Sequence, residues 1–194
     1  SFAGQYDTVL NVQGPQELRD AIRRCVASAT NERARSYQQA QSAGDAITMN
    51  IVVQAMVDAR AAGVVFTADP VSARRDLLVI DAVAGLGEAL VSGEATPDHY
   101  GVHSSGTIVR RQLTGTTPLL SDAEIMAIAT QARAAATHEG HPLDLEWAID
   151  QDGILYWLQA RPITTLPAHL NEFDTVLPRP HDVLTISNVS EMMP

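Results

Sequence analysis

Three residues of this sequence have side chains suited to phosphate chemistry: Glu146, Gln159 and Arg161. They lie in one stretch, residues 144–165, with the sequence DLEWAIDQDGILYWLQARPITT. Two oxygen ligands and an arginine fork suit a magnesium ion bridged to phosphates. The residues alone leave a second interpretation open, in which these side chains form the solvated polar face of an amphipathic hairpin.

The Asp152-Gly153 pair lies between two alternating runs and predicts a β-hairpin with a two-residue turn. This turn places Glu146 opposite Gln159, with Cβ atoms roughly 5 Å apart. A three-residue turn would place Glu146 opposite Leu158 and mix polar with apolar side chains on each face. We therefore favour the two-residue turn.

The same register places Asp144 opposite Arg161, on the polar face of the hairpin. The other face is apolar and is predicted to point into a core. Its residues are Leu143, Leu145, Trp147 and Ile149 on the first strand, and Ile154, Tyr156, Leu158 and Ala160 on the second.

Composition narrows the classes of protein. The chain has 194 residues, enough for one domain, or one domain with a tail. Its net charge of −10 argues against nucleic acid or an anionic membrane as the main partner. There is no transmembrane-length apolar run and no signal-peptide pattern. A single cysteine, Cys25, excludes an internal disulfide and favours a cytoplasmic location.

All 13 basic residues are arginines, and the sequence contains no lysine. Phosphate-binding proteins often use a lysine as a point charge. If this chain handles ATP, we expect that lysine to lie elsewhere. The chain begins with Ser1 and ends at Pro194, so we also expect it to be part of a longer protein.

Periodicity and turn signals predict an α+β fold with a mainly antiparallel sheet and flanking helices. A helix is expected from Pro15, and another over residues 122–136, where Ser121 and Glu124 form a capping box. Residues 1–166 are predicted as the domain, and residues 167–194 as a linker or the start of a following segment. The expected strands cover residues 8–12, 49–57, 64–67 (after a turn at residues 60–63), 77–82, 96–102 and 108–113.

Other motifs are less specific. Gly85-Leu86-Gly87-Glu88 follows a predicted strand and is either a phosphate-cradling turn or a structural strand-to-helix turn. It lacks the third glycine of a dinucleotide fingerprint and the Lys-Ser/Thr of a P-loop. The six histidines are scattered without the spacing of a zinc site.

The segments SFAGQYDT, IVVQAMV, AGVVFTADPV, GLGEALVSGEATPD, DLEWAI and QARPITT occur in this order. Together they resemble the nucleotide-binding domain of the pyruvate phosphate dikinase and phosphoenolpyruvate synthase group. The resemblance covers about residues 1–166, and the tail SNVSEMMP favours the rifampin-phosphotransferase-like branch. It implies the C-terminal part of an ATP-grasp domain, a fold in which two lobes clamp ATP.

The resemblance also implies roles for individual residues. Glu146 and Gln159 match residues that hold Mg²⁺ and the polyphosphate, and Arg161 matches one that contacts phosphate and stabilises charge as a phosphoryl group departs. Glu146 and Arg161 are therefore the expected catalytic pair. Asp144 and Glu88 are adjacent candidates.

Further positions match the nucleotide's other contacts. Gln54 is expected beside the adenine, although a core strand is the default interpretation of its segment. Gly4 and Thr8 match a loop that approaches the phosphates. The ATP-clamping lysine would lie before Ser1, so we expect weak or absent ATP binding by this chain alone.

The implied activity is that of a dikinase-type phosphotransferase, which splits ATP to AMP and phosphate. Its β-phosphoryl group would pass through a histidine, on a swivelling domain outside this chain, to a hydroxylated acceptor such as rifampin. The alternative acceptor is pyruvate, as in phosphoenolpyruvate synthase. A different class of function is a non-catalytic nucleotide-binding or regulatory module that keeps the fold without the chemistry.

Overall fold

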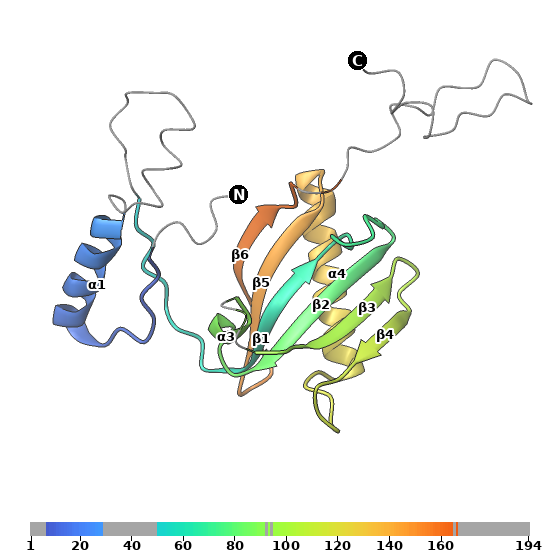
Figure 1. Cartoon of the computed structure of the whole chain (residues 1–194), viewed down its shortest axis with the longest axis horizontal. Coiled ribbons are helices and arrows are strands. Elements are labelled where there is room, and N and C mark those ends of the chain that lie inside the picture. The colour runs from blue at the N-terminus through green and yellow to red at the C-terminus, as the bar shows by residue number, and fades with distance from the viewer. Residues whose placement is uncertain (1–6, 29–49, 92, 94, 165, 167–194) are drawn as a thin grey trace, which may run out of the picture. The chain divides into compact units, whose positions relative to one another are not determined.

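The chain folds around a six-stranded antiparallel sheet with the order β4-β3-β2-β1-β5-β6 (Figure 1). The computed structural model describes residues 7–28, 50–91, 93, 95–164 and 166. The strands are β1 (Ala59–Phe66), β2 (Leu77–Ala84), β3 (Asp98–His103), β4 (Ile108–Gln112), β5 (Leu143–Asp150) and β6 (Leu155–Pro162). The described helices are α1 (Gly14–Ser28), α3 (Glu88–Val91) and α4 (Asp122–Glu139).

Helix α4 covers one face of the sheet (Figure 1). Its buried stripe, Ile125, Ile128, Ala129 and Ala132, packs into the same core as the apolar side chains of the strands. The predicted capping box at Ser121 and Glu124 is confirmed, and the helix ends at Gly140 in the left-handed conformation. The sequence therefore predicted this helix and its start correctly, and the α+β architecture of an ATP-grasp-like lobe is confirmed.

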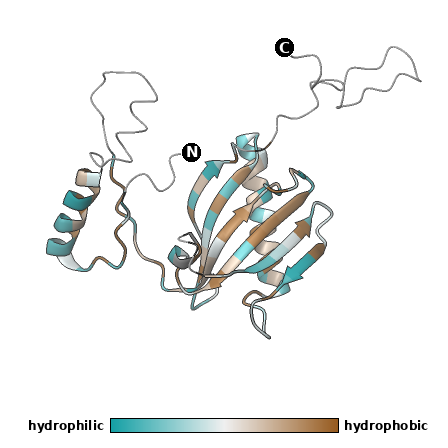
Figure 2. Cartoon of the chain, in the orientation of Figure 1, coloured by the Kyte–Doolittle hydropathy of each residue, from teal (hydrophilic) through white to brown (hydrophobic). Residues whose placement is uncertain are grey.

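The hydropathy of the strands depends on their position in the sheet. The central strands β1 and β2 are apolar along most of their length, whereas β4 and β6 at the sheet edges carry more polar residues (Figure 2). Within the described helices, none has the length and apolarity needed to cross a membrane.

Strand β1 corrects the sequence-based prediction. We expected a turn at residues 60–63, but Arg60 to Gly63 lie inside β1, which pairs with β2 on one side and β5 on the other. The small residues are there because space is short: a Cβ on Gly63 would lie 1.9 Å from the carbonyl oxygen of Asp81 and 3.0 Å from the Trp147 ring. Small residues are typical of loops, which explains the wrong prediction. Here they occur because the strand is central and tightly packed.

Two other predicted strands are also wrong. Residues 8–12 form no strand, and neither do residues 50–57, which lead into β1; residue 49 lies outside the described range. Their β-branched composition favours a strand, but a strand also requires a pairing partner, which neither segment has among the described residues. The strands predicted at residues 77–82, 96–102 and 108–113 are confirmed as β2, β3 and β4.

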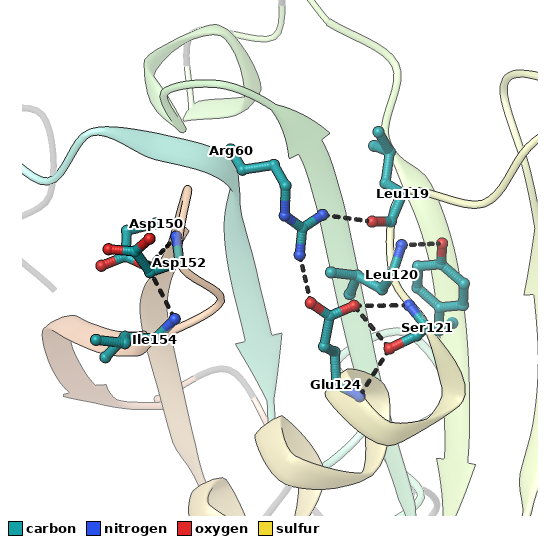
Figure 3. Close-up of polar contacts among 9 residues, drawn as sticks. Arg60, Leu119, Leu120, Ser121, Glu124, Asp150, Asp152 and Ile154 are labelled. Carbon is teal, nitrogen blue, oxygen red and sulfur yellow. Dashed lines mark hydrogen bonds and ion pairs between the residues drawn. The ribbon is translucent and has the colours of Figure 1, made fainter.

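The bulge at Arg60 connects β1 to the start of α4. Arg60 is an extra residue in the β1–β5 pairing, so its flanking alanines, Ala59 and Ala61, point to opposite faces of the sheet. The guanidinium reaches the α4 side, where it donates to the Leu119 carbonyl over 3.1 Å and forms an ion pair with Glu124 (Figure 3). The bulge thus fixes the beginning of β1 against the capped end of the helix.

Asp98 organises the connection from β4 to α4. Asp98 is 1% exposed, and its carboxylate accepts hydrogen bonds from the Thr114 backbone and hydroxyl at 2.8 and 2.9 Å. It also accepts from the Leu119 backbone and the Tyr100 hydroxyl, each at 3.0 Å. Burial opposes ionisation, but these donors outweigh it and lower the pKa of Asp98 below its ordinary value of 3.8.

Replacing Asp98 with Asn should lower the free energy of unfolding by about 2–3 kcal/mol at neutral pH, because an amide nitrogen would face donors. A lowered folded-state pKa stabilises the fold above the unfolded pKa, and this contribution is lost as the pH falls through the folded pKa. The difference between the two proteins should therefore shrink at strongly acidic pH in urea titrations. The control is Asp122→Asn, whose side chain is 71% exposed; an equal loss in both variants would contradict the assignment.

Candidate functional site

The face of the sheet opposite α4 carries a row of side chains that are polar except for Val64. Directly paired residues of neighbouring antiparallel strands point to the same face. Glu146 pairs with Val64 of β1 on one side and with Gln159 of β6 on the other. From β4 to β6, the row is Gln112, His99, Asp81, Val64, Glu146 and Gln159. We call this the open face.

The predicted pairing of the site residues is confirmed. Glu146 lies opposite Gln159, and Asp144 lies opposite Arg161. Asp144 is buried, Glu146 is half-buried and Gln159 is exposed. The Arg161 Nε donates to Asp144 Oδ2 over 2.7 Å, so the carboxylate orients the guanidinium along the open face.

The turn that produces this pairing differs from the prediction. It has three residues, with Gly153 at φ 84° and the Gly153 N–H donating to the Asp150 carbonyl over 3.2 Å. The Asp150 carboxylate accepts from the backbone N–H groups of Asp152 and Ile154, at 3.0 and 2.8 Å, and holds the longer turn (Figure 3).

A β-bulge at Leu158 restores the expected register. Beyond it, Trp147 pairs with Trp157, one residue out of step with the Glu146–Gln159 pair. The predicted apolar face is therefore half right. Leu143, Leu145, Trp147 and Ile149 are buried as predicted. After the turn, by contrast, Leu155 packs against the core, whereas Ile154, Tyr156 and Ala160 are exposed. Leu158 lies on the opposite face.

Leu158 completes an apolar patch on the open face beside Glu146. The patch consists of Ala59, Ala62 and Ala148, with Val57, Leu86 and Leu158 packed against them. Ala62 and Ala148 are each two residues from members of the polar row, which places them on the same face. The predicted position of Leu158 on the core face is wrong, because the bulge at this residue interrupts the alternation of β6.

A pocket of about 470 Å³ lies at this end of the sheet. Gln54 and the following residues to Asp58 line one side, and Tyr156, Trp157 and Leu158 line another. Gln54 is exposed there, as a residue available to a ligand would be. Thr8 and Gln54 both line a second pocket, of about 630 Å³, beside α1. Gly4 lies outside the described residues.

Electrostatics make Glu146 the unusual carboxylate of the site. Burial raises its pKa above the ordinary value of 4.5; Arg161 offsets part of this rise, and Asp144 adds to it. Within the described part of the chain, the Glu146 carboxylate forms no hydrogen bond. A half-buried carboxylate without a donor is the kind of group that a cation would stabilise.

Asp144 provides a second observation that fits a cation. Its Oδ1 atom is buried and has no hydrogen-bond partner among the described residues. With a Glu146 oxygen and the Gln159 amide oxygen, it makes three hard oxygen donors on two neighbouring strands. No cluster of three or more His, Cys, Asp or Glu side chains occurs in the described ranges, so Mg²⁺ would need further ligands from phosphate or water, as it commonly does.

The Gly85–Glu88 turn is the other element near the site. The Gly85 N–H donates to the Arg60 carbonyl over 3.0 Å, and Gly85 has φ 71°, which favours glycine. A Cβ on Gly87 would lie 3.6 Å from the Ala62 Cβ, so the turn lies against the apolar patch. Glu88 is exposed at the first position of α3.

This α+β lobe, with a carboxylate–amide pair and an oriented arginine on its open face, belongs to a known class of nucleotide-binding domains. The chain matches the family described as pyruvate phosphate dikinase, AMP/ATP-binding domain, at residues 1–117 and 111–175. The chain is a member of that family.

Similar curated proteins have several names. A probable phosphoenolpyruvate synthase of Methanothermobacter thermautotrophicus is 40% identical over 190 residues, covering 86% of this chain and 28% of the relative. A rifampicin phosphotransferase of a Streptomyces species is also 40% identical, covering 86% and 22%. The prodigiosin synthesizing transferase PigC of Serratia marcescens is 38% identical, covering 85% and 21%. The chain thus spans about a quarter of the length of these relatives.

Glu146→Gln should stabilise the fold at neutral pH. Because the pKa of Glu146 is raised in the folded state, its ionised form lowers the free energy of unfolding. This loss is complete at pH values above the folded-state pKa and absent below the unfolded-state pKa of about 4.5. We expect a gain on the order of 1 kcal/mol near pH 7.5 in urea titrations, disappearing on acidification. The exposed Glu139→Gln variant should change little, and a less stable Glu146→Gln protein at pH 7.5 would refute the burial argument.

Proposed function

We propose that this chain is the ATP-binding part of a dikinase-type phosphotransferase. The whole enzyme would split ATP to AMP and phosphate and pass the β-phosphoryl group through a histidine on a separate, swivelling domain to a hydroxylated acceptor. The observation that supports this most directly is the Glu146–Gln159 pair beside the Asp144–Arg161 pair on the open face. Membership of an AMP/ATP-binding family supports an adenine nucleotide as the ligand.

Glu146 and Gln159 would hold Mg²⁺ and the polyphosphate, with Asp144 Oδ1 as an added ligand. When bound, the ion would neutralise charge on the phosphate oxygens. Arg161 would contact a phosphoryl group through its terminal nitrogens, which have no hydrogen bond within the described residues, while its Nε stays on Asp144. This arrangement keeps the guanidinium oriented before the phosphate arrives, which is how preorganised charge lowers a barrier. Glu146 and Arg161 are the catalytic pair of the proposal.

The adenine would lie in the pocket between Gln54 and Leu158. The pocket combines a backbone segment without a strand partner, which can hydrogen-bond a base edge, with the apolar patch that a flat ring can cover. Gly4 and Thr8 belong to the proposal as residues of a loop over the phosphates. Residues 1–166 would be the nucleotide-binding unit and residues 167–194 the connection to the next part of the protein.

The acceptor is proposed to be a hydroxylated molecule such as rifampin. The second candidate is pyruvate, because a probable phosphoenolpyruvate synthase is as similar to the chain as a rifampicin phosphotransferase is. A non-catalytic module is less well supported, because the carboxylates and the arginine are all present with the required pairing. We further propose a cytoplasmic enzyme that binds neither nucleic acid nor membrane, in line with the net charge of −10.

Glu146→Ala in the full-length protein should reduce AMP formation from ATP by a factor of about 100 or more, because Mg²⁺ and polyphosphate lose a ligand. Arg161→Lys should also reduce it, since an ammonium cannot replace a fork held by Asp144. AMP can be measured by chromatography, with rifampin and pyruvate supplied in separate assays to identify the acceptor. Glu139→Ala is the control at an exposed position, and unchanged AMP formation in Glu146→Ala would reject the proposal.

A further inference from the structure

A chain of three side chains crosses β2, β3 and β4 on the open face, away from the Glu146 site. The His99 Nδ1 lies 2.6 Å from Asp81 Oδ1, and an Arg110 terminal nitrogen lies 3.3 Å from His99 Nε2. The side chains of His99 and Asp81 are 25% and 21% exposed, and Arg110 is exposed. None of these residues takes part in the function proposed above.

The donors and acceptors of this chain fix its direction. Arginine can only donate, so His99 Nε2 accepts from Arg110 and the ring proton is on Nδ1, which donates to Asp81. Asp81 thereby selects the tautomer, and His99 holds one N–H of Arg110. A guanidinium has five N–H groups, so most of those on Arg110 remain available for another acceptor.

Glycine opposite Arg110 makes room for this arrangement. Arg110 pairs with Gly101, and a Cβ on Gly101 would lie 3.0 Å from the Arg110 Cβ and 3.4 Å from a Leu77 methyl group. The arginine stem can therefore lie close to the sheet and reach His99.

We propose that Arg110, positioned by His99 and Asp81, binds a phosphoryl oxyanion of the inorganic phosphate class. An arginine fork suits a tetrahedral oxyanion, and a fork held in place before binding loses less entropy. The family's ligands, AMP and ATP, carry phosphate, and His99 and Glu146 belong to the same row.

The site would hold a phosphate separate from the one at Glu146. Three strand intervals of about 4.8 Å separate His99 from Glu146 in the row, roughly 14 Å in all, so the two sites do not share a phosphoryl group. The same oxyanion chemistry could come from free phosphate or from a phosphoryl group on an imidazole of another domain.

The test is an NMR titration of the 194-residue chain with sodium phosphate at constant ionic strength, following the His99 ring and the Arg110 Nε–H. We expect saturable shifts at both, and affinity reduced about tenfold or more in Arg110→Gln. Arg111→Gln is the matched control, because Arg111 is the neighbouring residue and pairs with Asp122 instead. Absence of saturation, or equal losses in both variants, would overturn the proposal.

Variants of His99 test its positioning role. Glutamine can accept from Arg110 and donate to Asp81 as the imidazole does, so His99→Gln should retain phosphate binding, whereas His99→Leu should weaken it. The control is His103→Gln. His103 lies on β3, as His99 does, but it pairs with Asp76, so this variant should bind phosphate as the unchanged protein does. Loss in His99→Gln equal to that in His99→Leu would refute the positioning role.

Two further experiments distinguish free phosphate from phosphorylated imidazole, and the Arg110 site from the Glu146 site. Phosphorylated imidazole in place of phosphate shows which form binds more tightly; binding of that compound alone would reject free phosphate as the ligand. Glu146→Gln should retain the phosphate shifts at Arg110, so failure of the nucleotide site and failure of this site give different results. Loss of the Arg110 shifts in Glu146→Gln would reject a separate site.

Discussion

The close approach of three strands at Gly63 is the constraint on which the site depends. The absence of a side chain at this position lets β1 lie against the Asp81 carbonyl while the Trp147 ring packs over it. Any larger residue would separate β1 from its neighbours. Because β1 is paired on both sides, its register also fixes the row in which Asp81, Val64 and Glu146 stand side by side. Core packing therefore decides which polar residues share the open face.

Two bulges adjust the sheet where regular alternation would send a side chain to the wrong face. The one at Arg60 directs a guanidinium to the capped start of α4, and the one at Leu158 brings a leucine to the open face. Strand pairing continues on both sides of each bulge. As a result, the same end of the sheet combines a rigid attachment to the helix with an apolar patch beside the polar residues.

The Glu146 environment shows a conflict between stability and the proposed chemistry. Burial and the neighbouring Asp144 both disfavour its charge, and Arg161 relieves only part of this. Asp144 itself keeps one oxygen buried without a donor. Such unsatisfied acceptors are unfavourable in a fold selected only for stability, and they are useful where a cation and its phosphate ligands complete the set.

Local sequence determined the parts of this protein that depend on near neighbours: the capping box of α4 and the alternation of β5. The pairing of Glu146 with Gln159 was predicted correctly from a two-residue turn that the chain does not form. Tertiary structure decided the rest. Residues 60–63 became a central strand because β2 and β5 pair with them from distant parts of the chain, and residues 50–57 remained unpaired. The Asp150 side chain stabilises a three-residue turn through nearby backbone groups, a local effect that the Asp-Gly signal did not reveal. The bulge at Leu158, within the β5–β6 pairing, then places Glu146 opposite Gln159. Caps and periodicity are set by residues a few positions apart, whereas register and strand partners are set by packing between segments that the sequence does not place together.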